Sequence, residues 1–222
     1  MRDAHAFADQ ACVPAGTNDL LLERAGDLLE DEWLELLARS ADVPLLDGMR
    51  MPLFPATDVQ RRFVGNSGRN ALHEAERFYR LVKNAARQLA NPIGRDSNVL
   101  DFGCGWGRMI RYFLRDVNPA NLYGCDVLPE AVALCRSLDL RANFELIEPA
   151  PPSRFPDMMF HVIFAYSVFS HLSEDLHMAW IREISRILRP NGILVATTHS
   201  RRFIDYCAEL RAQDVHATRW HE

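Results

Sequence analysis

The chain has 222 residues, of which 48% are hydrophobic and 25% are charged, a composition typical of a globular protein with one substantial core. Its formal net charge of −5 excludes a broadly basic surface, so we expect no nucleic-acid partner. No apolar run reaches the roughly 18 residues of a membrane-spanning helix, and the N-terminus lacks the apolar core of a secretory signal. These features favour a cytoplasmic protein that does not enter a membrane.

The cysteines give no sign of a disulfide framework or a metal site. Their number is odd, no C-x-x-C pair occurs, and no histidine lies nearby at ligand spacing; they are Cys12, Cys104, Cys125, Cys135 and Cys207. We therefore expect reduced thiols and no metal.

The first part of the chain is predicted to be helical. Residues 1–16 show no clear pattern, and we expect them to be flexible. From 18 to 38, apolar residues recur at helical spacing, which predicts an amphipathic helix with an acidic, solvated outer face. Gly26 inside this segment permits a kink or a division into two shorter helices.

A proline-containing segment separates this helix from a second one. Prolines at 44, 52 and 55 mark an extended linker that ends near 64–68. Helical spacing of apolar residues then predicts a helix over 71–89. We therefore place a helical N-terminal extension with its linker over 1–60 and a second domain over 61–222.

From residue 98 onward the pattern changes to short strands that alternate with helices. The predicted strands are short apolar runs bounded by glycine, proline or acidic residues, at 99–101, 122–126, 144–147, 161–165 and 193–197. The predicted helices are 106–114, 130–137, 174–188 and 201–211. Such alternation predicts right-handed βαβ units and a parallel sheet, with ligands at the carboxyl ends of the strands.

A glycine-rich turn follows the first of these strands. The segment from Val99 to Arg108 reads V-L-D-F-G-C-G-W-G-R. Glycines allow positive φ and close approach of a ligand, and this turn is typical of a nucleoside site. A dinucleotide fingerprint would need glycine or alanine where Arg108 stands, so a nicotinamide-dependent oxidoreductase is disfavoured.

This turn resembles the first motif of the class I S-adenosylmethionine-dependent methyltransferases, an acid followed by three alternating glycines. Asp101, Gly103, Gly105 and Gly107 match it, and Asp126 ends the next predicted strand, where an acid can accept both ribose hydroxyls. The resemblance implies S-adenosylmethionine as cofactor, because a carboxylate suits its ammonium and sulfonium groups. The implied cofactor-binding residues are Asp101, Gly103, Cys104, Gly105, Gly107, Asp126, Val127, Glu148, Tyr166 and Ser167, with Glu148 near the adenine.

The resemblance covers residues 65–199 and implies a Rossmann-like three-layer α/β sandwich with a mostly parallel sheet. His161 stands where many members have aspartate, and we expect a consequence for the fold only. Asn191 replaces the first glycine of the turn before the fifth strand, and asparagine tolerates the left-handed conformation required there. The family's sheet has two further strands after the fifth, so either the sequence is truncated after residue 222 or that edge is completed differently.

Two histidines are candidate catalytic residues. His171 follows the fourth strand and His199 the fifth, and either could act as a general base, with helix capping or a structural hydrogen bond as the alternative. Tyr166 and Ser167 could orient the cofactor or the acceptor, or make hydrogen bonds within their loop.

The acceptor is expected to be a small molecule, sugar-like or peptide-like, methylated on oxygen or nitrogen. The residues expected to cap its pocket are Arg61, Arg62, Phe63, Tyr79 and Arg80. The arginines among them could hold an acidic small molecule, with solubilising surface charge as the alternative. The alternative is a non-catalytic subunit that binds S-adenosylmethionine. The oligomeric state is not indicated by the sequence.

Overall fold

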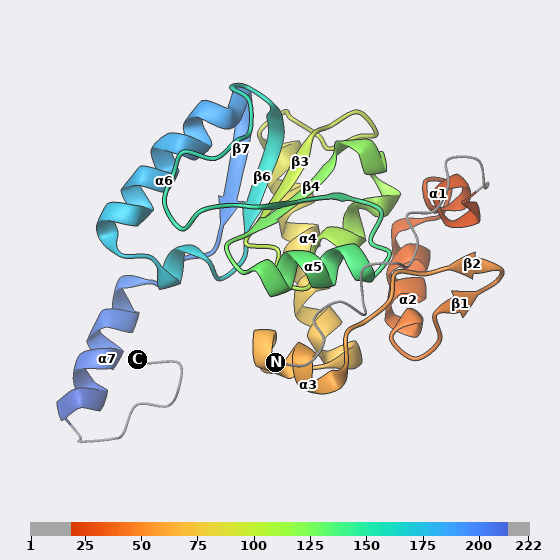
Figure 1. Cartoon of the computed structure of the whole chain (residues 1–222), viewed down its shortest axis with the longest axis horizontal. Helices are drawn as coiled ribbons and strands as arrows, with labels where there is room; N and C mark the ends of the chain where they lie inside the picture. The colour runs from red at the N-terminus through yellow and green to blue at the C-terminus, as the bar shows by residue number, and fades with distance from the viewer. Residues whose placement is uncertain (1–18, 213–222) are drawn as a thin grey trace, which may run out of the picture.

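A five-stranded parallel sheet forms the centre of the computed structural model, which describes residues 19–212 (Figure 1). The strands lie in the order β5-β4-β3-β6-β7, and each neighbouring pair is parallel. Their bounds are β3 Val99–Phe102, β4 Leu122–Asp126, β5 Asn143–Leu146, β6 Phe160–Ala165 and β7 Leu188–Ala196. The predicted parallel α/β fold is therefore confirmed, with all five strands close to their expected places.

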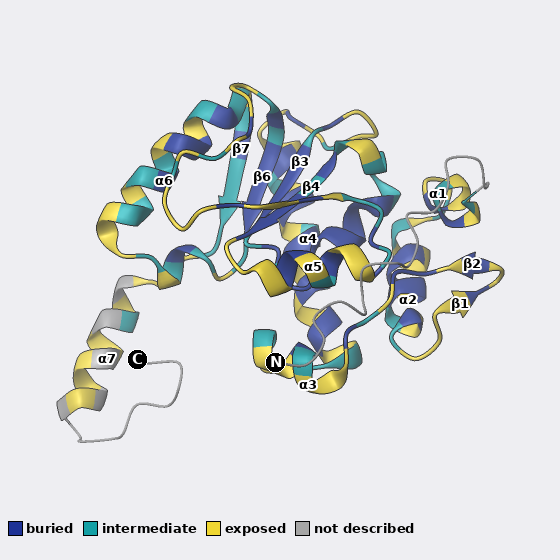
Figure 2. Ribbon diagram, viewed as in Figure 1, coloured by how far each residue is buried: buried dark blue, intermediate teal, exposed yellow. Residues whose placement is uncertain are grey.

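Helices cover both faces of the sheet, which gives three layers. One face packs against α4 (Gly68–Gln88), the 3₁₀ helix η1 (Ile110–Arg115) and α5 (Pro129–Ser137). The other face packs against α6 (Glu174–Ile187), whose Trp180 and Ile184 contact strand residues such as Phe102. Alternate residues of β3 therefore enter different cores, and the buried positions concentrate at these contacts (Figure 2).

The N-terminal extension adds to the first of these cores. The predicted helix at 18–38 is divided into α1 (Leu20–Ala25) and α2 (Glu30–Ser40), a division that Gly26 permits. Trp33 of α2 is fully buried, and its indole nitrogen donates a hydrogen bond to the Tyr112 carbonyl oxygen at 2.8 Å. The extension and the sheet domain thus share one apolar cluster.

The predicted extended linker is instead partly ordered into regular elements. A short antiparallel pair forms between β1 (Leu45–Leu46) and β2 (Met49–Arg50), because Asp47 and Gly48 both adopt the positive φ of a tight hairpin turn. α3 (Thr57–Val64) follows and ends at Gly65, which has φ 72°. The prediction of a linker without helix or strand over this stretch was wrong.

The helix predicted over 106–114 is also replaced. Residues after the glycine turn form further turns and then η1, a 3₁₀ helix. In an α-helix the Gly107 carbonyl oxygen would accept from the backbone N–H of Arg111, but here it accepts from the Arg111 side chain at 3.2 Å. Gly107 itself has φ 75°, a conformation that an α-helix of L-residues does not include, so no α-helix runs through it.

Two departures from the family pattern have local explanations. Asn191 has φ 65°, as expected, within an irregularity in the pairing of β7 that makes this strand longer than predicted. His161 opens β6, where its Nδ1 accepts a hydrogen bond from the Asn98 backbone at 2.9 Å, and burial lowers its pKa. It does not line the cavity described below.

Another 3₁₀ turn, η2 (Pro119–Asn121), precedes β4, and η3 (Phe169–His171) follows β6. α7 (Arg201–Ala212) extends away from the sheet (Figure 1), and within residues 19–212 no strand follows β7. None of the helices described is long and apolar enough to cross a membrane.

The expectation for residues 1–16 lies outside the described residues, as do the side chains of Cys12 and Cys207. Cys104, Cys125 and Cys135 are free thiols.

Candidate functional site

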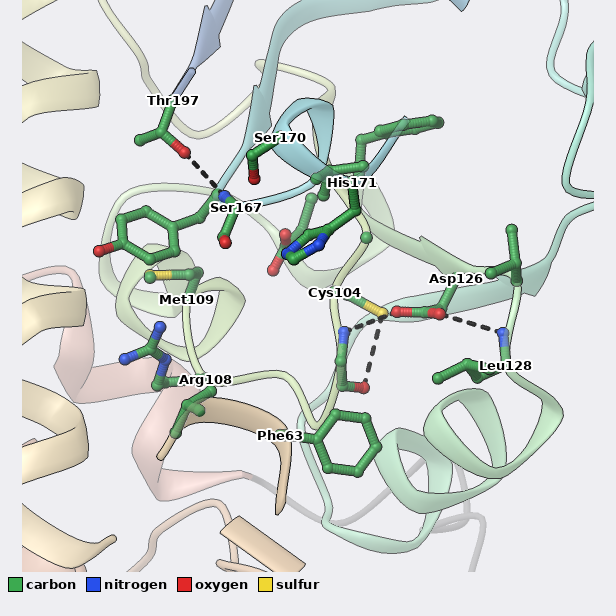
Figure 3. A pocket seen from close by; sticks show the side chains of 18 of the residues that line it. Phe63, Cys104, Arg108, Met109, Asp126, Leu128, Ser167, Ser170, His171 and Thr197 are labelled. Carbon is green, nitrogen blue, oxygen red and sulfur yellow. Dashed lines mark hydrogen bonds between the residues drawn. The ribbon is translucent and has the colours of Figure 1, made fainter. Parts of the chain in front are cut away.

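A cavity of about 750 Å³ opens at the carboxyl ends of β3, β4, β6 and β7 (Figure 3). Its walls come from the glycine turn after β3, the end of β4, and the loops after β6 and β7. This is the edge at which parallel α/β sheets bind ligands. The volume is typical of a small-molecule site.

The three glycines of the turn have different structural roles, although all have positive φ. A Cβ on Gly103 would lie 2.3 Å from Val168 Cγ2, and one on Gly107 would lie 2.2 Å from Leu140 Cδ1. Gly107 does not line the cavity, so packing rather than ligand contact requires it. A Cβ on Gly105 would meet only Phe63, at 3.5 Å, so Gly105 borders open space.

Asp101 lines the cavity, and one of its carboxylate oxygens is enclosed without a hydrogen-bond partner among the described residues. The residue is 1% exposed, and the enclosed oxygen is Oδ2. Burial, and then the nearby charge of Asp126, raises the pKa of Asp101 to about 8. A cation bound in the cavity beside Asp101 would favour the charged form of this carboxyl group, and the ammonium group of a methionyl tail is such a cation.

Asp126 fixes the opposite side of the glycine turn. Its Oδ2 accepts a hydrogen bond from the Gly105 backbone at 2.9 Å, and its Oδ1 accepts one from the Leu128 backbone at 3.0 Å. Because each carboxylate oxygen can accept two hydrogen bonds, both retain capacity for ribose hydroxyls. Asp126 therefore acts as a structural cap and also lines the cavity, beside Val127 and Cys104.

The loops after β6 and β7 supply a polar rim. The Ser167 backbone donates a hydrogen bond to Thr197 Oγ1 at 2.7 Å, which ties the two loops together. His171, on η3, is exposed at the cavity, whereas His199 stacks on Phe203 of α7 with ring centroids 3.9 Å apart. The rim comprises Tyr166, Ser167, Ser170, His171, Thr197, Thr198 and His199. Figure 3 labels four of them, Ser167, Ser170, His171 and Thr197.

An ionic group on α4 reaches the same cavity. Glu74 accepts hydrogen bonds from Arg108 Nη1 at 2.7 Å and from the Tyr166 hydroxyl. Burial raises the pKa of Glu74, but its hydrogen bonds with Tyr166 and Arg108 outweigh that effect and lower the pKa. Burial, and then Glu74, raises the pKa of Tyr166 to about 12, so this hydroxyl stays protonated at neutral pH.

Several predicted site residues lie elsewhere. Glu148 is exposed and outside the cavity lining, which is formed by its neighbours Ile147 and Pro149, so the structure gives no support for an adenine contact by Glu148.

Most of the residues expected to cap the acceptor pocket are also displaced from it. Phe63 lines the cavity, but Arg61 and Arg62 are exposed on α3 outside the lining. Tyr79 is buried, and its hydroxyl donates to Asp116 at 2.6 Å. Arg80 pairs with acidic residues of α2 and α4 instead.

Sequence reasoning missed other lining residues. Arg108 and Trp106 lie within the motif itself, and their place beside three alternating glycines was an available signal. Glu74 and Met109 carried no such signal, because their position depends on how α4 and η1 pack against the turn.

Comparison with known proteins identifies the domain. Residues 99–192 match the family model described as a methyltransferase domain. Solved structures of similar fold include the YcgJ protein of Bacillus subtilis, 22% identical, with a TM-score of 0.49, covering 63% of this chain and 59% of that one. S-adenosylmethionine-bound CalS10, an amino pentose methyltransferase from Micromonospora echinaspora, is 20% identical, with a TM-score of 0.49 and coverage of 66% and 57%.

DesVI of Streptomyces venezuelae is 18% identical, with a TM-score of 0.48 and coverage of 66% and 58%. This chain thus spans less than two thirds of the length of these three proteins. Since the TM-scores are below 0.5, the assignment rests on the matched segment, which contains the glycine turn and Asp126. Residues 99–192 are therefore similar to a methyltransferase domain.

Proposed function

We propose that this protein transfers the methyl group of S-adenosylmethionine to a hydroxyl or amino group of a small-molecule, sugar-like or peptide-like acceptor. The observation that carries this proposal is the continuity of the cavity. One volume of about 750 Å³ is bordered by Asp101 and Asp126 and also by the polar rim after β6 and β7. A cofactor held by the first group would share this space with an acceptor held by the second.

The protein's part in such a reaction is positioning. The cofactor supplies a methyl group already activated by a sulfonium, and the transfer is an in-line displacement. Asp101 would bind the ammonium group, Asp126 the ribose hydroxyls, and Gly105 would allow the backbone to approach closely. Tyr166 and Ser167 would orient the bound molecules, since both border the cavity where β6 ends.

The charges of the lining argue against an acidic acceptor. Three carboxylates, from Glu74, Asp101 and Asp126, line the described cavity together with one guanidinium, from Arg108. Even with Asp101 protonated, Glu74 and Asp126 leave this set with a net negative charge beside Arg108, so an anionic acceptor would be repelled. Because Arg61, Arg62 and Arg80 do not line the cavity, the reason for expecting an acidic acceptor is removed, and a neutral or amino-bearing acceptor fits better.

His171 is the proposed general base. It is exposed at the cavity on η3, whereas His199 stacks against Phe203. A base is needed only for a weakly nucleophilic acceptor such as a hydroxyl, whose proton must leave as the carbon–oxygen bond forms.

Turnover distinguishes this function from that of a non-catalytic cofactor-binding subunit. The purified protein is incubated with S-adenosylmethionine and a panel of hydroxyl- and amino-bearing metabolites, and S-adenosylhomocysteine is quantified by mass spectrometry. We expect acceptor-dependent S-adenosylhomocysteine, with a rate that falls about 10²–10⁴-fold in His171→Ala when the acceptor is a hydroxyl. Cofactor binding without turnover across the panel would favour the non-catalytic alternative.

A further inference from the structure

Two buried thiols lie in contact beside the glycine turn. Cys104 belongs to the turn and Cys135 to α5, and their sulfur atoms are 4.0 Å apart. Both sulfurs also lie close to the Gly105 carbonyl oxygen. Cys135 Sγ donates to it at 3.2 Å, and Cys104 Sγ lies 3.9 Å from it, a contact drawn as a dashed line in Figure 3. The thiol pair therefore joins α5 to the backbone that borders the ligand space.

The two thiols differ in their access to the cavity. Cys104 is 5% exposed and lines the cavity, whereas Cys135 is 0% exposed and does not line it. Cys125 is also 0% exposed, and it packs in the core on the other face of the sheet. Of the three described thiols, a small solute in the cavity thus reaches only Cys104, and Cys135 is the thiol in contact with it.

We propose that a peroxide oxidises Cys104 from the cavity and that Cys135 then forms a disulfide with it, which prevents the cofactor from binding. The Cys104 sulfur attacks one peroxide oxygen, the O–O bond breaks, and water leaves a sulfenic acid on Cys104. The Cys135 sulfur then attacks the Cys104 sulfur, and the oxygen leaves as a second water. Together the two thiols lose two electrons, which reduce the peroxide to water.

The new bond would change the geometry of the turn. A disulfide requires sulfur atoms about 2.05 Å apart, roughly half of their present separation, so α5 and the turn must move. There is little free space between them, since a Cβ on Gly107 would already lie 3.4 Å from Cys135 Sγ. Cys135 also loses the S–H that it donates to Gly105, whose own N–H donates to Asp126. The loss of cofactor binding rests on the proposed function, whereas the disulfide itself does not.

The same environment limits how fast the reaction proceeds. Hydrogen bonding to Cys135 and then burial raise the pKa of the Cys104 thiol, and the nearby acidic groups of Asp101 and Cys125 add to this. Because the thiolate is the attacking form, oxidation should be slow at neutral pH and faster as the pH rises. A ligand that fills the cavity should slow it further, so the unliganded protein is the form that is oxidised.

Peptide mapping tests the disulfide. The reduced protein is treated with hydrogen peroxide at mildly alkaline pH, with and without S-adenosylhomocysteine, and its remaining thiols are alkylated before digestion with trypsin. Trypsin places Cys104 in residues 96–108 and Cys135 in residues 116–136, which also contain Cys125. Cys125→Ser is therefore mapped beside the wild type. We expect these two peptides to be cross-linked in both proteins, less so with S-adenosylhomocysteine, and not at all after dithiothreitol.

Calorimetry on the same samples tests the consequence. The cross-linked protein should bind S-adenosylhomocysteine about tenfold or more weakly than the reduced protein, and dithiothreitol should restore the affinity. Cys135→Ser keeps a hydroxyl donor but cannot form the disulfide. Dimedone, which traps sulfenic acids, should therefore label Cys104 after peroxide treatment in this variant but not in the wild type.

A wild-type peptide map without this cross-link would overturn the proposal, whether or not the variants fold. So would a cross-link that Cys125→Ser abolishes, because Cys125 would then be the partner. Unchanged affinity in the cross-linked protein would show that the bond does not close the site. If the reduced protein did not bind S-adenosylhomocysteine, the proposed function and the expected loss of cofactor would fail together, and the peptide map would still decide on the disulfide.

Discussion

The two carboxylates at the base of the cavity differ in how they are satisfied. Asp126 accepts hydrogen bonds from two backbone N–H groups, whereas Asp101 has an oxygen with no partner among the described residues. Burial penalises the charged form of Asp101, and the nearby charge of Asp126 adds to this, so the pKa of Asp101 rises to about 8. Without a ligand, Asp101 holds a proton at neutral pH.

This protonation gives a prediction for cofactor binding. An ammonium group beside Asp101 favours the carboxylate, so S-adenosylhomocysteine should release a proton on binding at pH 7 and bind more tightly as the pH rises from 6 to 8. The folded, unliganded protein holds this proton more tightly than the unfolded chain does. Its stability should accordingly fall over the same pH range. Calorimetry in buffers of different ionisation enthalpy counts the proton.

Asp101→Asn is the control, because an amide cannot titrate in this range. It should abolish the proton release and weaken the binding of S-adenosylhomocysteine, while removing the loss of unliganded stability toward pH 8. An Asp101→Asn protein that released the same proton would assign the titration to another group.

At Asp126, structural and ligand roles overlap. Asp126→Ala should raise the Kd of S-adenosylhomocysteine about tenfold or more, since a lost charge-assisted hydrogen bond costs about 1.5–3 kcal/mol. The melting temperature should also fall, because the Gly105 and Leu128 N–H groups lose their acceptor. Glu148→Ala, at an exposed position outside the cavity, is the matched control and should change neither value. An unchanged Kd in folded Asp126→Ala would mean that Asp126 is a cap only.

At the scale of elements, two glycines of the turn after β3 have different roles: Gly107 is required by packing, and Gly105 borders the space for a ligand. Gly107→Ala should lower the melting temperature more than Gly105→Ala does, because its Cβ would lie 2.2 Å from Leu140, whereas that of Gly105 meets only Phe63 at 3.5 Å. Gly105→Val should instead remove the binding of S-adenosylhomocysteine by filling open space beside the backbone. Thermal melts and calorimetry on the same variants check both effects. Near-normal affinity in Gly105→Val would show that the ligand does not approach this backbone.

The elements that the sequence predicts well are those whose pattern is local. The sheet strands are short apolar runs between breakers, and the glycine turn and Asp126 fall at strand ends, as expected. The replacement of a helix by η1 was missed, because the apolar spacing over 106–114 does not reveal that Gly107 adopts φ 75°. The hairpin at Asp47 and Gly48 had a recognisable turn signal, but its strands are only two residues each.

The residues of the site, like the elements of the fold, could be predicted only where the sequence pattern is local. Helical periodicity assigns Tyr79 to the apolar face of α4, and its burial follows from that pattern rather than from a place near the acceptor. Glu74 and Arg108 are 34 residues apart, and only the packing of α4 against the turn joins them. Residues in the motif were therefore predictable, and residues brought to it by tertiary packing were not.

On the scale of the whole molecule, a buried ionic cluster joins the N-terminal extension to the sheet domain. Lys83 is the only lysine of the sequence. Its Nζ lies 2.6 Å from Glu30 of α2 and 2.9 Å from Asp116, and its side chain is 6% exposed. The proposed boundary near residue 60 therefore divides the sequence but not the core, since α1 and α2 share the cluster that contains η1 and α4.

Lys83→Met should destabilise the fold by about 1.5–3 kcal/mol, because Glu30 and Asp116 lose the buried cation that they share and keep only their pairs with Arg80 and Arg115. Urea unfolding measures this loss. In the wild type, an amine-reactive ester should modify the α-amino group but not Lys83 until the protein unfolds. Rapid modification of Lys83 in the folded state would contradict the packing of α2 against α4. Arg69→Met, at an exposed ion pair, is the control and should cost about 1 kcal/mol or less.

The central claim is that the cavity at the carboxyl ends of β3 and β4 binds S-adenosylmethionine rather than a dinucleotide. Calorimetric titration of the wild-type protein with S-adenosylhomocysteine and, separately, with NADH tests this most directly. We predict saturable binding of one S-adenosylhomocysteine per chain and no heat of binding with NADH. Binding of NADH, with no signal from S-adenosylhomocysteine at millimolar concentration, would contradict it.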